Sequence, residues 1–123
     1  MSIFKTRDFA EWARDEGLTD EALHTAVQEM EQGLINANLG GNVYKKRVPI
    51  HGRGKSGGLR TIVAFKKEDK AFFIYGFAKN KRDNIKDTEL KALKLLAKEL
   101  FGYTDQALEK AIEAGQLIEV QEP

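Results

Sequence analysis

The clearest strand pattern of this chain is LRTIVAFKKEDKAFFIYGFA, residues 59–78. Residues 59–66 are rich in β-branched and aromatic side chains, which favour strands. Residues 71–78 are almost entirely apolar, as expected of a strand that is buried on both faces. The polar residues 67–70 between them fit a tight turn. The stretch therefore predicts a β-hairpin, with strands at 59–66 and 70–78, at the centre of a sheet.

Ahead of the hairpin, most apolar residues follow helical spacing. A short strand at residues 3–4 precedes a first helix that ends near Gly17 and is defined by Phe9, Trp12 and Ala13. Thr19 can cap a second helix, and one apolar stripe runs along it, formed by Leu23, Ala26, Val27, Met30 and Leu34. Residues 38–42 break this pattern and predict a turn. Residues 43–48 then predict a strand that Pro49 closes.

Behind the hairpin, helical spacing returns. We expect a helix from Asp87 or Thr88 to Gly102, which would stop it in a left-handed conformation. Thr104 can cap a last short helix that Gly115 ends, and residues 117–120 fit a brief strand or a docked tail. The predicted fold is α+β: N-terminal helices packed on a three- to four-stranded antiparallel sheet, with C-terminal helices.

Length and composition indicate one globular domain. The chain has 123 residues, of which 41% are hydrophobic and 32% are charged. It has no cysteine, which excludes disulfides, thiolate metal sites and a cysteine nucleophile. The sequence lacks a signal peptide and any apolar run long enough to cross a membrane, so we expect a cytoplasmic protein without a membrane partner.

The net charge of +1 hides a strong segregation of charge along the chain. Residues 43–86 carry thirteen basic and three acidic side chains, a balance of +10, whereas the segments before and after it are acidic. A segment of this charge attracts polyanions such as nucleic acid. The alternative is that these lysines and arginines only cover the solvent side of a sheet and neutralise acidic helices beside it.

Several common chemistries have no support in the sequence. The two histidines, His24 and His51, form no metal-ligand pattern and have no obvious nucleophile beside them, so no metal and no cofactor is predicted. Residues 52–58 contain Gly-Lys-Ser, but a phosphate-binding loop also needs a glycine that four residues separate from its Gly-Lys pair, and Pro49 stands at that position. These residues fit a flexible loop between two strands better than a nucleotide site.

The basic residues of the sheet offer a different chemistry. Lys45 and Arg47 share one face of a strand because side chains alternate with period two. Arg60 interrupts an apolar strand, either at an edge with its stem packed down or to hold a phosphate. Cations suffice to cleave RNA, because the ribose 2′-OH attacks its own phosphate and only alignment, proton transfer and charge stabilisation are required.

Two segments resemble RelE-type toxins of toxin–antitoxin modules: Gly58 to Phe65, and the later run from Phe72 to Ile85. The second segment ends in Phe-Ala-Lys-Asn-Lys-Arg-Asp-Asn-Ile. The resemblance is closest to a longer, RelE/HigB-like subgroup with a C-terminal extension. It implies a RelE/ParE-like fold over residues 1–123 as one toxin domain, with residues 102–123 as the extension. It also implies a ribosome-dependent endoribonuclease that cuts messenger RNA (an mRNA interferase) and a cognate antitoxin that holds it inactive.

The resemblance also implies roles for individual residues. The family's strand lysines match Lys45 and, with a basic substitution, Arg47, and the arginine that contacts the scissile phosphate matches Arg60. Asn80 stands where the family has a leaving-group arginine, and Lys86 stands where it has a base-stacking aromatic residue. We therefore expect a catalytic set of Lys45, Arg47, Arg60, Lys79 and Arg82. The remaining basic residues are expected to bind RNA: Lys46, Arg53, Lys55, Lys81 and Lys86.

Three functions remain open on the sequence. The first is the mRNA interferase, with messenger RNA, the ribosome and the antitoxin as partners. The second is a ParE-like inhibitor of DNA gyrase, for which Arg60 would matter little. The third is an RNA-binding relative without catalysis. The antitoxin follows from the resemblance, with one physical hint: an acidic peptide laid across a basic groove would silence it.

Overall fold

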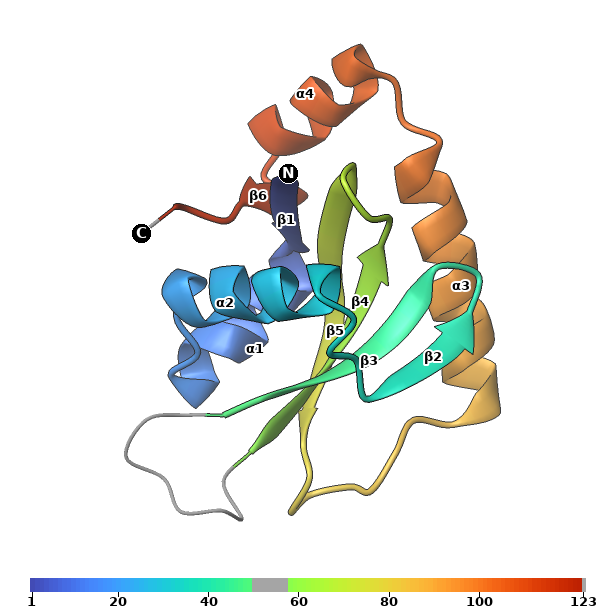
Figure 1. The fold of residues 1–123 in the computed structure, drawn as a ribbon. Helices are drawn as coiled ribbons and strands as arrows, with labels where there is room; N and C mark the ends of the chain where they lie inside the picture. The colour runs from blue at the N-terminus through green and yellow to red at the C-terminus, as the bar shows by residue number, and fades with distance from the viewer. Residues whose placement is uncertain (50–57, 123) are drawn as a thin grey trace.

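The predicted hairpin lies at the middle of the sheet (Figure 1). In the computed structural model, which describes residues 1–49 and 58–122, strand β4 (Leu59–Phe65) pairs antiparallel with β5 (Lys70–Ala78). β3 (Val43–Val48) pairs antiparallel with the other side of β4 and ends just before Pro49. The hairpin and the strand before it are therefore confirmed.

The sheet is wider than the three or four strands that were expected. The described residues form six strands in the order β2-β3-β4-β5-β1-β6. β1 (Ser2–Thr6) lies parallel to β5, and β6 (Leu117–Glu119) pairs antiparallel with β1, so the segment after Gly102 contributes an edge strand. The α+β class is confirmed, with this one parallel pair in an otherwise antiparallel sheet.

The extra strand on the opposite edge was predicted as a turn. β2 (Ala37–Gly40) pairs with β3, and only the end of the predicted turn is a turn. There Gly40, Gly41 and Asn42 have φ angles of 89°, 63° and 62°, in the left-handed region that glycine and asparagine tolerate best. Turn-forming residues at the end of a four-residue edge strand conceal that strand in the sequence.

Two N-terminal helices cover one face of the sheet. Helix α1 (Arg7–Glu16) ends at Gly17, and α2 (Asp20–Glu31) is capped by the Thr19 hydroxyl, which accepts a hydrogen bond from the Ala22 N–H. Their buried side chains pack on the sheet in one core cluster that includes Phe9, Leu23, Val27, Met30, Val63 and Phe73. Leu34 was wrongly placed in this stripe: α2 ends at Glu31, and Leu34 is 56% exposed.

Two C-terminal helices, α3 (Asp87–Phe101) and α4 (Asp105–Glu113), belong to the core on the opposite face. Ala97 and Leu100 of α3 are buried there with Ile62 and Phe72 of the sheet. The prediction for Gly102 was wrong. Its φ angle is −86°, and its N–H bonds to the carbonyls of Lys98 and Glu99, so the chain leaves α3 without a left-handed residue.

A β-bulge in β5 directs two aromatic side chains to the α3 face. Ile62 pairs with Tyr75 and Val63 pairs with Phe73, which leaves Ile74 as the extra residue. Phe73 packs in the α1–α2 core, whereas Tyr75 and Phe77 pack with the α3 core. Without the bulge, strict alternation would direct Tyr75 to the same side as Phe73.

Gly76 provides a test of this arrangement. A Cβ atom at Gly76 would lie 2.1 Å from Cζ3 of the Trp12 ring, so Gly76→Ala is expected to push α1 off the sheet. Overpacking of this kind lowers the free energy of unfolding by about 1–3 kcal/mol, measurable by urea denaturation. Gly102→Ala is the control, because a Cβ there meets atoms no closer than 3.4 Å. Equal stability of the two variants would contradict the packing of Trp12 on Gly76.

Candidate nucleic-acid interface

Strand β3 distributes its basic residues between the two faces of the sheet. Val43 packs in the core on the α3 side, and Val48 packs in the core on the α1–α2 side. Because side chains alternate, Lys45 and Arg47 share the α3 side with Val43. The sequence-based expectation that these two cations lie on one face agrees with this placement.

Lys46 lies on the other face and is tied down there. Its Nζ is 2.9 Å from Oε1 of Glu29 and donates a hydrogen bond to the Leu34 carbonyl oxygen at 2.9 Å, and its side chain is only 8% exposed. A buried lysine paired with α2 anchors that helix to the sheet. The structure therefore separates Lys46 from the other cations that were expected to bind RNA.

Arg47 and Arg60 meet on the α3 face. They are directly opposite each other on β3 and β4, and Gly58 lies beside both guanidinium groups. A Cβ atom at Gly58 would lie 3.1 Å from Nε of Arg47 and 3.4 Å from Nη1 of Arg60. Like charges directly opposite in a sheet destabilise it, so two converging guanidinium groups form a place where an anion is favoured.

Arg60 has an unused hydrogen-bond donor. Its Nη1 is buried and has no hydrogen-bond partner among the described residues. Loss of solvent, and then the positive charge of Arg47, lower the pKa of Arg60, but a guanidinium stays protonated at neutral pH. A buried donor without a partner costs about 1–3 kcal/mol. A phosphate oxygen between the two arginines would satisfy this donor and offset the repulsion.

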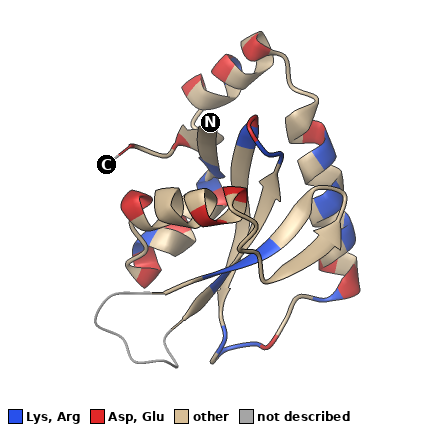
Figure 2. Ribbon diagram, viewed as in Figure 1, with Lys and Arg blue, Asp and Glu red and all other residues tan. Residues whose placement is uncertain are grey.

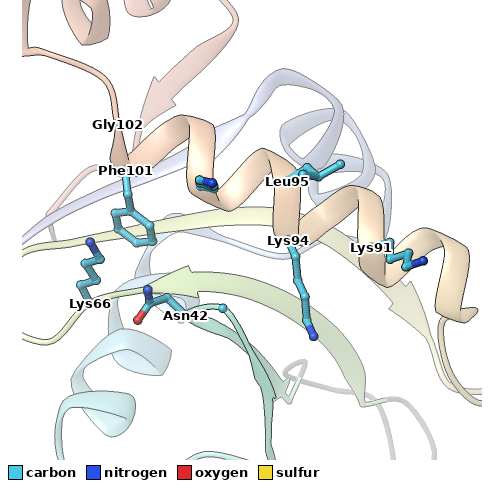
Figure 3. A pocket seen from close by; sticks show the side chains of 9 residues that line it. Asn42, Lys66, Lys91, Lys94, Leu95, Phe101 and Gly102 are labelled. Atoms are coloured by element: carbon cyan, nitrogen blue, oxygen red, sulfur yellow. The ribbon is translucent and has the colours of Figure 1, made fainter.

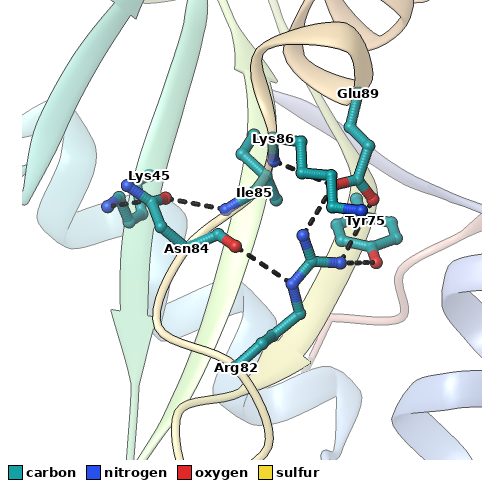
Figure 4. A network of polar contacts seen from close by, with 7 residues as sticks. All are labelled: Lys45, Tyr75, Arg82, Asn84, Ile85, Lys86 and Glu89. Carbon is teal, nitrogen blue, oxygen red and sulfur yellow. Dashed lines mark hydrogen bonds and ion pairs between the residues drawn. The ribbon is translucent and has the colours of Figure 1, made fainter.

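The loop after β5 is fixed by Arg82, as Figure 4 shows. The Arg82 guanidinium contacts both carboxylate oxygens of Glu89, at 2.5 and 3.1 Å. It also donates to the Tyr75 hydroxyl and to the Asn84 carbonyl oxygen, each at 3.0 Å. Arg82 thus joins the loop to the first turn of α3 and to β5.

This network changes the acid–base properties of both partners. Hydrogen bonds from Arg82, and then from the Lys86 N–H, lower the pKa of Glu89 to about 2. The hydrogen bond with Glu89 in turn raises the pKa of Arg82. Since its three nitrogens all donate to protein oxygens, Arg82 orders the loop instead of presenting a free charge.

Lys45 is connected to the same loop. Its Nζ donates to Oδ1 of Asn84 at 3.3 Å, and the same oxygen accepts the Ile85 N–H at 2.9 Å (Figure 4). Asn84 therefore connects β3 to the loop between β5 and α3. The two contacts hold Lys45 on the side of the sheet that carries Arg47.

Of the other predicted site residues, Lys79, Lys81 and Lys86 are exposed on the segment from β5 to α3. Ala78 pairs with Leu59, so Lys79 leaves the sheet at the same end as Gly58. Figure 2 shows basic residues on β3, on this segment and along α3, and acidic ones on α2 and α4. Arg53 and Lys55 lie outside the described residues.

Three residues that sequence reasoning did not select complete the interface: Tyr75, Asn84 and Glu89. Tyr75 was expected only as part of a buried strand, and the bulge that turns it to this face leaves no signal in the apolar run. Asn84 belongs to the Lys-Asn-x-Arg-Asp-Asn-Ile segment, which was the available signal. Glu89 lies three residues after the helix N-cap, where glutamate is a common capping residue.

Comparison with known proteins identifies the class. A family model described as "RelE toxin of RelE / RelB toxin-antitoxin system" matches residues 1–120. The chain belongs to the RelE toxin family and is therefore the toxin of a toxin–antitoxin system, a family whose members pair with an antitoxin. Within residues 1–49 and 58–122, no cluster of three potential metal ligands occurs, and no helix is long and apolar enough to cross a membrane.

The Arg82–Glu89 pair makes a pH-dependent prediction. Glu89→Gln is expected to lower the free energy of unfolding at pH 7, because the glutamine cannot form the paired ionic hydrogen bonds. A carboxylate with a depressed pKa stabilises the fold fully above its ordinary value of 4.5 and loses that effect as pH falls toward about 2. The difference between wild type and Glu89→Gln, measured by urea denaturation, should therefore shrink between pH 4.5 and pH 2.

Glu99→Gln, at an exposed position of the same helix, is the matched control and should differ little from wild type throughout this range. A difference for Glu89→Gln that stays constant from pH 7 to pH 3 would contradict the role assigned to the carboxylate.

Proposed function

We propose that this toxin is a ribosome-dependent mRNA interferase, acting in the cytoplasm, in which Arg47 and Arg60 hold the scissile phosphate. The observation that carries the proposal is the convergence of the two guanidinium groups beside Gly58, with Nη1 of Arg60 buried and unbonded within the described chain. Planar guanidinium groups bind phosphate oxygens through paired hydrogen bonds. Membership of the RelE family supports the same reading of the site.

The proposed reaction is attack of the ribose 2′-OH on the adjacent phosphate. The new bond joins the 2′ oxygen to phosphorus, and the bond to the 5′ oxygen of the next nucleotide breaks, leaving a cyclic phosphate and a 5′-OH. Arg47 and Arg60 would neutralise the charge that grows on the non-bridging oxygens. Two fixed cations lower the barrier most when they are already in position, and the neighbouring strands supply that rigidity.

The remaining cations differ in their proposed roles. Lys45 shares the face of Arg47, and Lys79 leaves the sheet beside Gly58, so both are candidates for contacts to the reacting proton or the leaving oxygen. We assign Arg82 a positioning role, because its donors are engaged by Glu89, Tyr75 and Asn84. Lys81 and Lys86, both exposed, would contact the RNA backbone or the ribosome.

Substitution of Arg60 tests the proposal. Cleavage of a reporter messenger on purified ribosomes is expected to fall roughly 100- to 1000-fold in Arg60→Ala, because a fixed donor to the developing charge is lost. Growth arrest after induced expression should disappear in parallel, and primer extension should map in-frame cuts with wild type only. Lys67→Ala, at the exposed β4–β5 turn, is the control and should behave as wild type.

Other outcomes would point to the other functions. Arrest without cuts, unchanged in Arg60→Ala, would favour a gyrase inhibitor. The absence of arrest, with ribosome binding retained, would favour an RNA-binding relative without catalysis. Either result would contradict the interferase proposal.

A further inference from the structure

A second basic surface lies at the opposite end of the α3 face. It is a groove of about 720 Å³ between α3 and the turns β2–β3 and β4–β5, which we call the α3 groove. Its walls carry four lysines and two large apolar side chains: Lys66, Lys91, Lys94, Lys98, Leu95 and Phe101. Asn42 also lines it and directly precedes β3, whereas Arg47 lies near the far end of that strand, so the groove is separate from the arginine pair.

The apolar part of the groove is left open to solvent. Leu95 is 70% exposed, the highest exposure among the large hydrophobic side chains of the described residues. Phe101 packs edge-on against Phe72 and is half-buried, with Nζ of Lys66 4.7 Å from its ring centroid. Figure 3 shows Lys66 and Asn42 beneath Phe101, and Lys94 reaching from α3 toward the sheet. An occupant with apolar side chains could cover Leu95 and Phe101.

The lysines of the groove lack acidic partners. Lys91, Lys94 and Lys98 are spaced by three and four residues, so they are neighbours on one side of α3. None of them forms an ion pair within the described part of the chain, and none of the residues that line the groove is acidic. Like charges at this spacing destabilise a helix. The stem of Lys94 packs on Gly41, where a Cβ would lie 3.6 Å from Cγ of Lys94.

We propose that the α3 groove docks an acidic, amphipathic segment of the antitoxin. The argument is charge complementarity around an apolar centre: carboxylates of the partner would pair with the lysines, and one or two apolar side chains would cover Leu95 and Phe101. Charged rims around a buried apolar anchor are the usual anatomy of a protein interface. RNA is the less suitable occupant, because an exposed leucine at the centre of the groove offers nothing to a phosphate backbone.

Binding in the α3 groove is thus a different event from phosphate binding at the arginine pair. The antitoxin segment would bind α3 without contacting Arg60. The same helix carries Glu89, which positions Arg82 in the loop of the candidate interface. Variants of the groove and variants of Arg60 should therefore have separable effects, and failure of the interferase proposal would leave this one testable.

The test measures the affinity of the refolded toxin for its co-encoded antitoxin by titration calorimetry. Leu95→Asp and the double variant Lys91→Glu/Lys98→Glu are each expected to raise Kd about tenfold or more, because an apolar anchor or two charge pairs are lost. The matched controls are Leu34→Asp, at another exposed leucine, and Lys67→Glu, at an exposed lysine of the β4–β5 turn. Circular dichroism and urea denaturation confirm that each variant folds.

Unchanged Kd values for both groove variants would overturn the proposal. It would also be overturned if the lysine variant weakened ribosome binding while antitoxin affinity stayed the same, which would indicate RNA as the occupant. A wild-type dimer that Leu95→Asp converts to a monomer, with unchanged antitoxin affinity, would assign the groove to a second copy of the chain.

Discussion

Two arginines that face each other across neighbouring strands are the constraint on which the candidate interface depends. Arg47 and Arg60 lie opposite each other in the register of β3 and β4, and Nη1 of Arg60 is buried without a partner among the described residues. Neither feature stabilises the free protein. Burial of apolar side chains offsets this cost, since the same two strands contribute residues to the cores on both faces of the sheet. A buried donor without a partner calls for an explanation, and an anion bound between the two arginines would supply one.

The surrounding structure orders Lys45 and the loop after β5 on the sheet face that carries the two arginines. The bulge in β5 directs Tyr75 to the arginine side, where its hydroxyl accepts a hydrogen bond from Arg82. Arg82 in turn holds Glu89 at the start of α3, and Asn84 connects the same loop to Lys45. Helix α3, which packs on this face of the sheet, therefore also helps to order the candidate interface.

Much of the fold could be predicted because it follows from local patterns. The hairpin is encoded by the apolar run of residues 59–78, and the caps at Thr19 and Thr104 by their position before amphipathic stretches. The shared face of Lys45 and Arg47 follows from strand alternation alone. The same alternation places Lys46 on the other face, but only the structure reveals Glu29 as its partner. β2 could not be predicted, because its four residues have weak strand propensity and lead directly into the turn residues Gly41 and Asn42.

The interface was less predictable than the fold because it depends on contacts between distant segments. Arg60 stood out as a cation within an apolar strand, but its unpartnered Nη1 depends on how β3, β4 and Gly58 meet. Arg82 was expected in the catalytic set, whereas Glu89 and Tyr75 engage its donors. The bulge that positions Tyr75 can be recognised only from the pairing register of β4 and β5. The sequence thus indicated which residue types the interface contains, but not which residues contact one another.

The anion site at Arg47 and Arg60 is tested most directly by the stability of Arg60→Met with and without phosphate, measured by urea denaturation at constant ionic strength. We expect the variant to be at least as stable as wild type without phosphate, because a repulsion and an unsatisfied donor are removed. Phosphate should then stabilise wild type more than Arg60→Met, since only wild type offers both guanidinium groups. A variant that is clearly less stable than wild type, with the same response to phosphate, would contradict an anion site formed by Arg47 and Arg60.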